Sequence, residues 1–288
     1  QAIEIEDEYA VAHAGMADSY TLLVTWEALR PDEGFSKAKQ AAGRALEIDP
    51  ALAEAHAGLG HTLLHTLEWE ASAREFRRAI DLNSGYAPAH QWYSEYLAAV
   101  GAFDESMAAI RRALELDPVS VNINADVARM LYLAGRCDEA IEQIRQTIEM
   151  EPEFWLPHHL AGQIYTQTEM YEEALAEFGT AMELSGRGPL SGILIGHAYA
   201  VAGMRSEALA AAAQLSDLWK ERYFSPYRLA VIYAGLEDEV RMFEWLEVAY
   251  ESRDANLIWL KVAPMLDSFR ARPQFQDLML RVGFQRCC

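Results

Sequence analysis

The sequence predicts an all-α fold built from a repeated pair of helices, and three observations support this prediction. Apolar residues recur three and four positions apart along most of the chain, which is the spacing of helices with one buried face. Turn signals such as Asp117-Pro118 and Glu151-Pro152 separate these patterns, and these two lie 34 residues apart. A single short helix pair cannot bury its own apolar face, so each pair needs the next one as a neighbour.

We expect seven consecutive repeats, one of them longer than the others. They span residues 10–52, 53–86, 87–120, 121–154, 155–188, 189–222 and 223–254. The first repeat carries nine extra residues between its helices, which predicts a lengthened hairpin. In that hairpin Trp26 and Leu29 are expected to continue the first helix, and Pro31 to begin the second.

The two ends of the chain depart from the repeat. Residues 1–9 resemble the end of a repeat, because QAIEIED matches RALEIDP at residues 44–50. We therefore expect a truncated preceding repeat and a chain cut from a longer protein. Residues 255–288 read as a cap over the last repeat, with a tail that frays. Pro264 and Pro273 should begin two short helices, the second with an apolar stripe of Phe275, Leu278, Met279 and Val282.

The repeat keeps residues of similar size at fixed positions. The eighth position is always small, the eleventh is large and apolar or aromatic, and the twentieth is small in all but the last repeat. The eighth position holds Ala17, Gly60, Ser94, Ala128, Gly162, Gly196 and Ala230. This spacing resembles the tetratricopeptide repeat, whose pattern is W-x2-L-G-x2-Y, A-x3-F and P. The resemblance implies a right-handed superhelix, an α-solenoid whose first helices line a concave groove.

A wider resemblance concerns the kind of protein that carries such an array. The lengthened first repeat, YFSPYRLAVIYAGL at 223–236 and KVAPMLDSFRARPQFQDL at 261–278 are similar to the carboxy-terminal repeat regions of bacterial multidomain signalling proteins. Those regions follow winged-helix regulators, nucleotide cyclases such as adenylate cyclase, or serine/threonine kinase domains, often through a TolB-like segment. The resemblance implies a regulatory or sensor module in a longer protein.

Composition narrows the functional classes. The net charge of −20 argues against nucleic-acid binding, because an acidic surface repels phosphate. No apolar run approaches the ~20 residues of a membrane span, and no leader of the signal-peptide type is visible. Cys137, Cys287 and Cys288 do not form a disulfide framework, so a reducing, cytoplasmic location is expected.

Histidines are the only residues that suggest metal chemistry. His13, His56, His90 and His158 occupy the same repeat position, which indicates equivalent packing positions rather than a cluster. His61 and His65 are four apart on one predicted helix, a spacing that can chelate a metal, and Glu68 is nearby. A pair alone is weak evidence, and we expect neither a metal nor a cofactor.

The predicted binding surface is the concave groove, where the resemblance places partner contacts at defined positions of each first helix. Polar and aromatic residues stand there in place of the apolar ones that packing alone would select, which suits capture of a peptide. Gln91, Trp92 and Glu95 are expected at an exposed inner edge. The full set is Asp18, His61, Gln91, Trp92, Glu95, Asp126, Arg129, Tyr132, His159, Gln163, His197, Tyr227 and Arg228.

The function expected from these features is protein interaction without catalysis. The sequence contains no phosphate-binding loop, GxSxG elbow or HExxH motif. We expect the groove to hold a peptide, loop or helix of a partner protein. Two alternatives stay open: an oligomerisation scaffold that forms a homodimer, and a small-ligand sensor using Arg129, Tyr132, His159 and Gln163.

Overall fold

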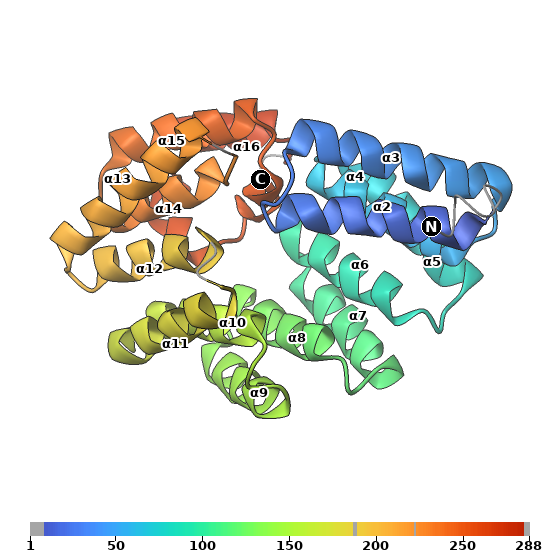
Figure 1. The fold of residues 1–288 in the computed structure, drawn as a ribbon, viewed down its shortest axis with the longest axis horizontal. Helices are drawn as coiled ribbons and strands as arrows, with labels where there is room; N and C mark the ends of the chain where they lie inside the picture. Colours follow the sequence, from blue (N-terminus) through green and yellow to red (C-terminus); the bar gives the residue numbers. More distant parts are fainter. Residues whose placement is uncertain (1–8, 187–188, 222, 285–288) are drawn as a thin grey trace. The chain divides into compact units, whose positions relative to one another are not determined.

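The computed structural model describes residues 9–186, 189–221 and 223–284. The described residues form helices and turns without any strand, so the prediction of an all-α fold is confirmed. In Figure 1 successive helices lie side by side as antiparallel pairs. None of the described helices is both long enough and apolar enough to cross a membrane.

The chain divides into two compact units. The N-terminal unit comprises Gln1–Pro118 and Ser252–Ile258, and the C-terminal unit comprises Val119–Glu251 and Trp259–Cys288. The helix pairs of the N-terminal unit are α2 (Ala10–Thr25) with α3 (Pro31–Ile48), α4 (Ala53–His65) with α5 (Trp69–Leu82), and α6 (Ala87–Ala99) with α7 (Phe103–Leu116). The chain returns to this unit through most of the 3-10 helix η1 (Ala255–Trp259).

The C-terminal unit has four further helix pairs and two short closing helices among its described residues. The pairs are α8 (Val121–Leu133) with α9 (Cys137–Met150), α10 (Trp155–Gln167) with α11 (Tyr171–Leu184), α12 (Pro189–Val201) with α13 (Arg205–Glu221), and α14 (Pro226–Gly235) with α15 (Glu239–Glu251). The closing helices are η2 (Pro264–Phe269) and α16 (Pro273–Arg281).

First helices pack on first helices within each unit: α2, α4 and α6 in one, and α8, α10, α12 and α14 in the other. The small eighth position of the repeat lets the first helix of a pair approach the second helix closely. A Cβ atom added to Gly60 would lie 2.9 Å from the ring of Phe76, and one added to Gly162 would lie 2.7 Å from the ring of Phe178. Both phenylalanines are fully buried, so they cannot move aside easily.

The turn inside each helix pair uses one residue with left-handed backbone geometry. These residues recur every 34 positions in the second to the seventh pair: Leu67, Gly101, Gly135, Glu169, Gly203 and Glu237, with φ between 57° and 87°. Glycine adopts this geometry without strain, whereas leucine and glutamate do not. The repeat therefore specifies the turn geometry even where it does not supply glycine.

The first hairpin differs in detail from its prediction. Helices α2 and α3 have 16 and 18 residues, against 13 and 14 in α4 and α5. Pro31 begins α3 as expected, but the prediction that Trp26 and Leu29 continue the first helix is wrong. Helix α2 ends at Thr25 because the chain turns through Glu27, which has a φ of 59°.

Prolines mark where the first helix of the last repeat and the two closing helices begin. Helix α14 begins at Pro226, three residues after the predicted start of its repeat at 223, because proline fits the first turn of a helix. Pro264 begins η2 and Pro273 begins α16. The stripe of Phe275, Leu278, Met279 and Val282 is buried, and α16 packs on α15.

Some predictions fall outside the described residues. The tail of a preceding repeat, residues 1–9, is described only at Tyr9, and the predicted fraying of residues 285–288 is not described. The SGRGPL segment is described in part: Gly186 has a φ of 69° after α11, and α12 begins at Pro189.

Candidate functional site

The N-terminal unit holds five of the predicted groove residues on three neighbouring first helices. Asp18 lies on α2, His61 on α4, and Gln91, Trp92 and Glu95 on α6. The His61 and Trp92 rings stack with centroids 4.7 Å apart and an angle of 5° between their planes. Glu95 Oε2 lies 3.8 Å from His61 Nε2. These contacts show that repeat-equivalent positions on adjacent first helices face each other.

The expected exposure of this inner edge is wrong for Glu95, which retains only 7% of its accessible surface. His61 is also buried, at 3%. Gln91 and Trp92 are half-buried. The tight packing of α4 on α6 covers the charged side chain, so the sequence pattern alone could not show which polar residues face solvent.

Asp18 is an unusual carboxyl group on the same set of helices. Its Oδ1 is buried and has no hydrogen-bond partner among the described residues. A Cβ atom on Gly58 would lie 2.2 Å from this oxygen, so the glycine makes room for the carboxyl group. Burial, and secondarily the negative charge of Glu54, raises the pKa of Asp18 to about 7.

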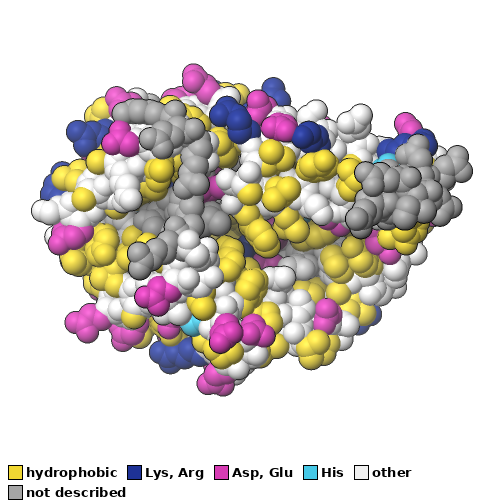
Figure 2. Space-filling model, viewed as in Figure 1, with side chains coloured by type: hydrophobic (Ala, Val, Ile, Leu, Met, Phe, Trp, Pro, Cys, Tyr) yellow, Lys and Arg dark blue, Asp and Glu magenta, His cyan; other side chains and the backbone are white. Residues whose placement is uncertain are grey.

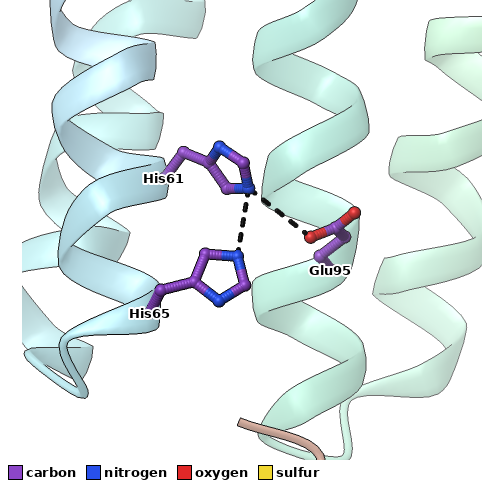
Figure 3. A group of neighbouring side chains, drawn as sticks. All are labelled: His61, His65 and Glu95. Atoms are coloured by element: carbon purple, nitrogen blue, oxygen red, sulfur yellow. Dashed lines mark hydrogen bonds and ion pairs between the residues drawn. The ribbon is translucent and has the colours of Figure 1, made fainter. Parts of the chain in front are cut away.

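The carboxylate that lies next to the two histidines of α4 is Glu95, whereas the sequence suggested Glu68. His61 Nε2 and His65 Nε2 are 3.2 Å apart, and Figure 3 shows Glu95 pointing toward them from α6. Glu68 instead accepts hydrogen bonds from Lys39 and Thr66. A signal for Glu95 was present, because it stands 34 residues after His61 and so occupies the same position of the next repeat.

The C-terminal unit brings a second set of predicted residues together around His159 on α10. Arg129 Nη1 lies 3.3 Å from Asp126 Oδ1 on α8, and Gln163 Nε2 donates to His159 Nε2 over 3.5 Å. Burial, then the positive charges of Arg228 and Arg129, holds the pKa of His159 well below its usual value. Arginines from two different repeats therefore both disfavour protonation of this buried imidazole.

Aromatic rings complete this cluster. Trp155 and Phe178 meet the His159 ring edge-on, with centroids 5.8 Å and 6.0 Å from it. Trp155 is half-buried, whereas Phe178 is fully buried. Sequence reasoning did not single out Trp155 as a site residue, although it precedes His159 by four residues and so lies on the same helix face.

Two other predicted residues, Tyr132 and His197, line a narrow pocket of the C-terminal unit together with Gln163, and this pocket has a volume of about 10 Å³. Met265 of η2 also lines it, which no motif indicated. Burial lowers the pKa of His197 to about 4 and, with Cys137 and Asp267, raises the pKa of Tyr132. Ligand pockets usually measure about 300–1,000 Å³, so this pocket gives little support to the small-ligand alternative.

The remaining two predicted residues lie together on α14. Tyr227 is buried at 5%, and Arg228 is half-buried. Seven of the thirteen predicted residues are thus buried: His61, Glu95, Asp126, Tyr132, His159, His197 and Tyr227.

The histidines at the equivalent repeat position behave as packing residues. His56 and His158 each contact a glutamate 19 residues later, at 2.6 Å, and a proline carbonyl six residues earlier, at 3.1 Å and 2.9 Å. Asn124 reproduces the pattern with Gln143 and the Ser120 carbonyl. Each side chain ties the turn between repeats to the second helix of its own pair, which supports the structural interpretation.

Comparison with known proteins identifies the repeat type. Residues 158–187 match the family model of the tetratricopeptide repeat. No curated protein matches the chain. The fold is similar to the crystal structure of the APC/C hetero-tetramer Cut9–Hcn1, with a TM-score of 0.63 and 15% identity over 97% of this chain and 50% of that one.

Two further solved structures have the same fold. The human IFIT1 dimer with PPP-AAAA matches with a TM-score of 0.60 and 18% identity, over 86% of this chain and 60% of that one. TTC0263, a thermophilic TPR protein of Thermus thermophilus, matches with a TM-score of 0.54 and 18% identity, over 58% of this chain and 91% of that one. The predicted α-solenoid class is thereby confirmed.

Proposed function

We propose that the chain is a non-catalytic protein-interaction module that binds an acidic peptide segment of a partner on α8, α10 and α14. Proteins built from tetratricopeptide repeats generally mediate protein–protein interactions, which supports the general class. In this proposal the module is the regulatory part of a longer cytoplasmic signalling protein, as its resemblance to bacterial signalling regions implies.

The observation that carries the proposal is the local positive charge around His159. Arg129 and Arg228 come from different repeats, and both disfavour protonation of the same imidazole. This occurs in a chain of net charge −20, and Asp126 offsets part of the local positive charge by pairing with Arg129 at 3.3 Å. A partly desolvated guanidinium binds a carboxylate through paired, charge-assisted hydrogen bonds.

Trp155 adds an apolar anchor beside the charges. Its ring is half-buried and packs edge-on against His159. Tryptophan and arginine are the residue types that contribute most to binding energy at protein interfaces. A peptide with an acidic residue next to an apolar one would match both features.

The experiment uses two pools of labelled peptides that are equal in aromatic content, one rich in Asp and Glu and the other rich in Lys. We expect the full chain to bind the acidic pool, as measured by fluorescence anisotropy. Arg129→Gln and Arg228→Gln should each weaken binding by about tenfold, which corresponds to ~1.4 kcal/mol. Arg111→Gln, at an exposed position of α7, is the matched control and should bind like the wild type.

Equal binding of both pools, or unchanged binding of acidic peptides by the two variants, would contradict the proposed site. Circular dichroism of the variants separates a local loss of binding from unfolding. Raising the salt concentration should weaken binding to the wild type, because the attraction is electrostatic and partly exposed to solvent.

A second candidate function, self-association, is favoured by the surface of α2. Tyr9, Met16 and Leu23 are seven residues apart and are 47%, 37% and 40% exposed, and Trp26 is 45% exposed. Residues seven apart share one face of a helix. In Figure 2, which shows the same face as Figure 1, hydrophobic side chains gather along the N-terminal unit with few charges between them.

Light scattering tests this candidate directly. If α2 pairs two copies, the wild type should be a dimer and Leu23→Glu should be a monomer. Val240→Glu is the control, because Val240 is an exposed apolar residue of α15 at 70% exposure. A wild-type monomer at high protein concentration would exclude self-association through α2.

A further inference from the structure

We propose that His61, His65 and Glu95 form a binding site for a single divalent transition-metal ion of the zinc type. The three side chains come from two adjacent first helices of the N-terminal unit, α4 and α6. One donor atom from each lies within 4.8 Å of the other two. This inference is independent of the proposed peptide site, which lies on α8, α10 and α14.

The spacing of the donor atoms fits a tetrahedral ion. Two ligand atoms at a zinc–nitrogen distance of about 2.05 Å are about 3.3 Å apart in tetrahedral geometry. His61 Nε2 and His65 Nε2 are 3.2 Å apart, and Glu95 Oε2 is 3.8 Å from His61 Nε2. The two nitrogens thus already have the separation of bound ligands, and a small rotation of the Glu95 carboxylate would bring in the third.

The orientation of His65 is fixed by a hydrogen bond outside the cluster. His65 Nδ1 lies 3.1 Å from the carbonyl oxygen of Ala255. A carbonyl oxygen can only accept, so Nδ1 carries the proton, and in the neutral ring Nε2 keeps its lone pair directed at His61. A histidine that ligates a metal typically makes this second contact, because it sets both tautomer and ring angle.

His61 is held in place by its neighbours rather than by a second hydrogen bond. Its ring stacks on Trp92 and meets His65 edge-on at 4.9 Å. Its Nδ1 has no hydrogen-bond partner among the described residues. A neutral imidazole has one ring nitrogen with a free lone pair, so Nε2 of this ring is the atom available to a metal ion.

The proposed metal site is buried, and its burial and donor atoms determine which ions suit it. His61, His65 and Glu95 are exposed by only 3%, 6% and 7%, and the Phe35 ring lies parallel to His65 at 6.2 Å. A metal ion bound here would be shielded from bulk water, which strengthens its attraction to the carboxylate. Two nitrogens and one carboxylate oxygen suit zinc, cobalt or nickel better than calcium or magnesium, which prefer all-oxygen sites.

The alternative to a metal ion is a hydrogen bond between the two histidines. His61 could carry its hydrogen on Nε2 and donate it to His65 Nε2, which would satisfy the 3.2 Å contact without a metal. That arrangement uses only the two histidines, whereas a metal also uses the nearby Glu95 carboxylate. Glu95 therefore distinguishes the two: it is a ligand in the metal site and a bystander in the histidine hydrogen bond.

The test uses the full chain, purified without a histidine tag and freed of metal by a chelator. Titration with Zn²⁺ should show one equivalent bound per chain and a rise of Tm, because the ion binds only the folded state. Co²⁺ should give the intense visible absorption of a four-coordinate site, with the fourth position taken by water. The Co²⁺ spectrum is read on the wild type and does not depend on the folding of any variant.

Variants assign the site to these residues. His65→Gln and Glu95→Gln should each weaken Zn²⁺ binding by about 100-fold or more, since even loss of an outer partner of a ligand costs about 10- to 100-fold. His56→Gln is the matched control on the same helix, because His56 already contacts Glu75 and the Pro50 carbonyl. Its Zn²⁺ affinity should equal that of the wild type.

Absence of stoichiometric Zn²⁺ binding together with an octahedral Co²⁺ spectrum would overturn the proposal in favour of the histidine hydrogen bond. Unchanged Zn²⁺ affinity in a folded Glu95→Gln variant would also overturn it. Neither result would affect the peptide-binding experiment, so the two proposals fail separately.

Discussion

At the scale of single residues, close contacts around the small positions keep adjacent helices together. Gly162 lies against the ring of Phe178, and its missing side chain lets α10 and α11 approach. The same contact recurs between Gly60 and Phe76. The hydroxyls of Ser72 and Ser106 add to this contact, because they donate to the carbonyls of Gly60 and Ser94 at 2.8 Å.

Gly162→Ala tests this contact. Its Cβ would lie 2.7 Å from the Phe178 ring, and overpacking of this kind costs about 1–3 kcal/mol of unfolding free energy. Gly179→Ala in α11 is the control, because no atom lies within 4 Å of the place its new Cβ would take and alanine favours the helix by about 0.5–1 kcal/mol. Urea denaturation should show the two substitutions moving stability in opposite directions.

Asp18 makes the stability of the fold depend on pH. Its pKa in the folded state is about 7, raised from 3.8, so the folded chain takes up this proton first as the pH falls. The carboxyl group therefore destabilises the fold fully above pH ~7, and this effect is lost progressively between pH ~7 and ~4.

Asp18→Asn should raise the free energy of unfolding by about 2 kcal/mol at pH 8, with a smaller gain at pH 5. Denaturation at both pH values measures the difference. Asp81→Asn removes the same charge from an exposed position of α5 and is the control. A gain that is equal at both pH values would show that burial of the Asp18 carboxyl group is not the cause.

At the scale of elements, the helix pairs differ in the backbone strain at their turn residue. Gly135 and Glu169 occupy the same position, with φ of 74° and 61°. A residue with a side chain is strained in this geometry by about 1–2 kcal/mol, whereas glycine is not.

Glu169→Gly should therefore stabilise the chain by about 1 kcal/mol, and Gly135→Ala should destabilise it by a similar amount. Glu169 is exposed, so few other contacts change. Thermal unfolding monitored by circular dichroism gives both values. If Glu169→Gly lowers Tm, strain at this position is not what limits stability.

Element boundaries were predictable where sequence punctuation is strong. Pro31, Pro264 and Pro273 each begin a helix as the sequence predicts. Prediction failed at Leu29, because the left-handed backbone of Glu27 ends the helix and gives no local signal in the sequence. It also failed at residue 223, because the first helix of the seventh repeat begins only at Pro226. Local patterns do not show the turn at Glu27, whereas Pro226 is a visible signal that the fixed 34-residue spacing overrode.

The candidate sites were predictable only in part, for a similar reason. The repeat position identified His61 and Glu95 separately, but not that α4 and α6 bury them against each other. His65 was recognised by its spacing and assigned the wrong carboxylate, because Glu68 is nearer in sequence. Pairing residues 34 positions apart would have found Glu95, since stacked repeats bring equivalent positions together.

At the scale of the whole molecule, charge is distributed unevenly. The chain carries 44 acidic and 24 basic residues, yet two arginines of the C-terminal unit act together on His159. An acidic surface repels most acidic peptides, so under the proposed function the arginines on α8 and α14 would select the acidic segments that bind. The repeat array supplies the rigid placement of residues from separate repeats.

Hydrogen–deuterium exchange with a bound acidic peptide tests the central claim most directly. We predict that saturating peptide slows exchange in the first helices α8, α10 and α14, and leaves the second helices α9, α11 and α15 unchanged. Slower exchange confined to the second helices, or none at all while the peptide is bound, would contradict the account.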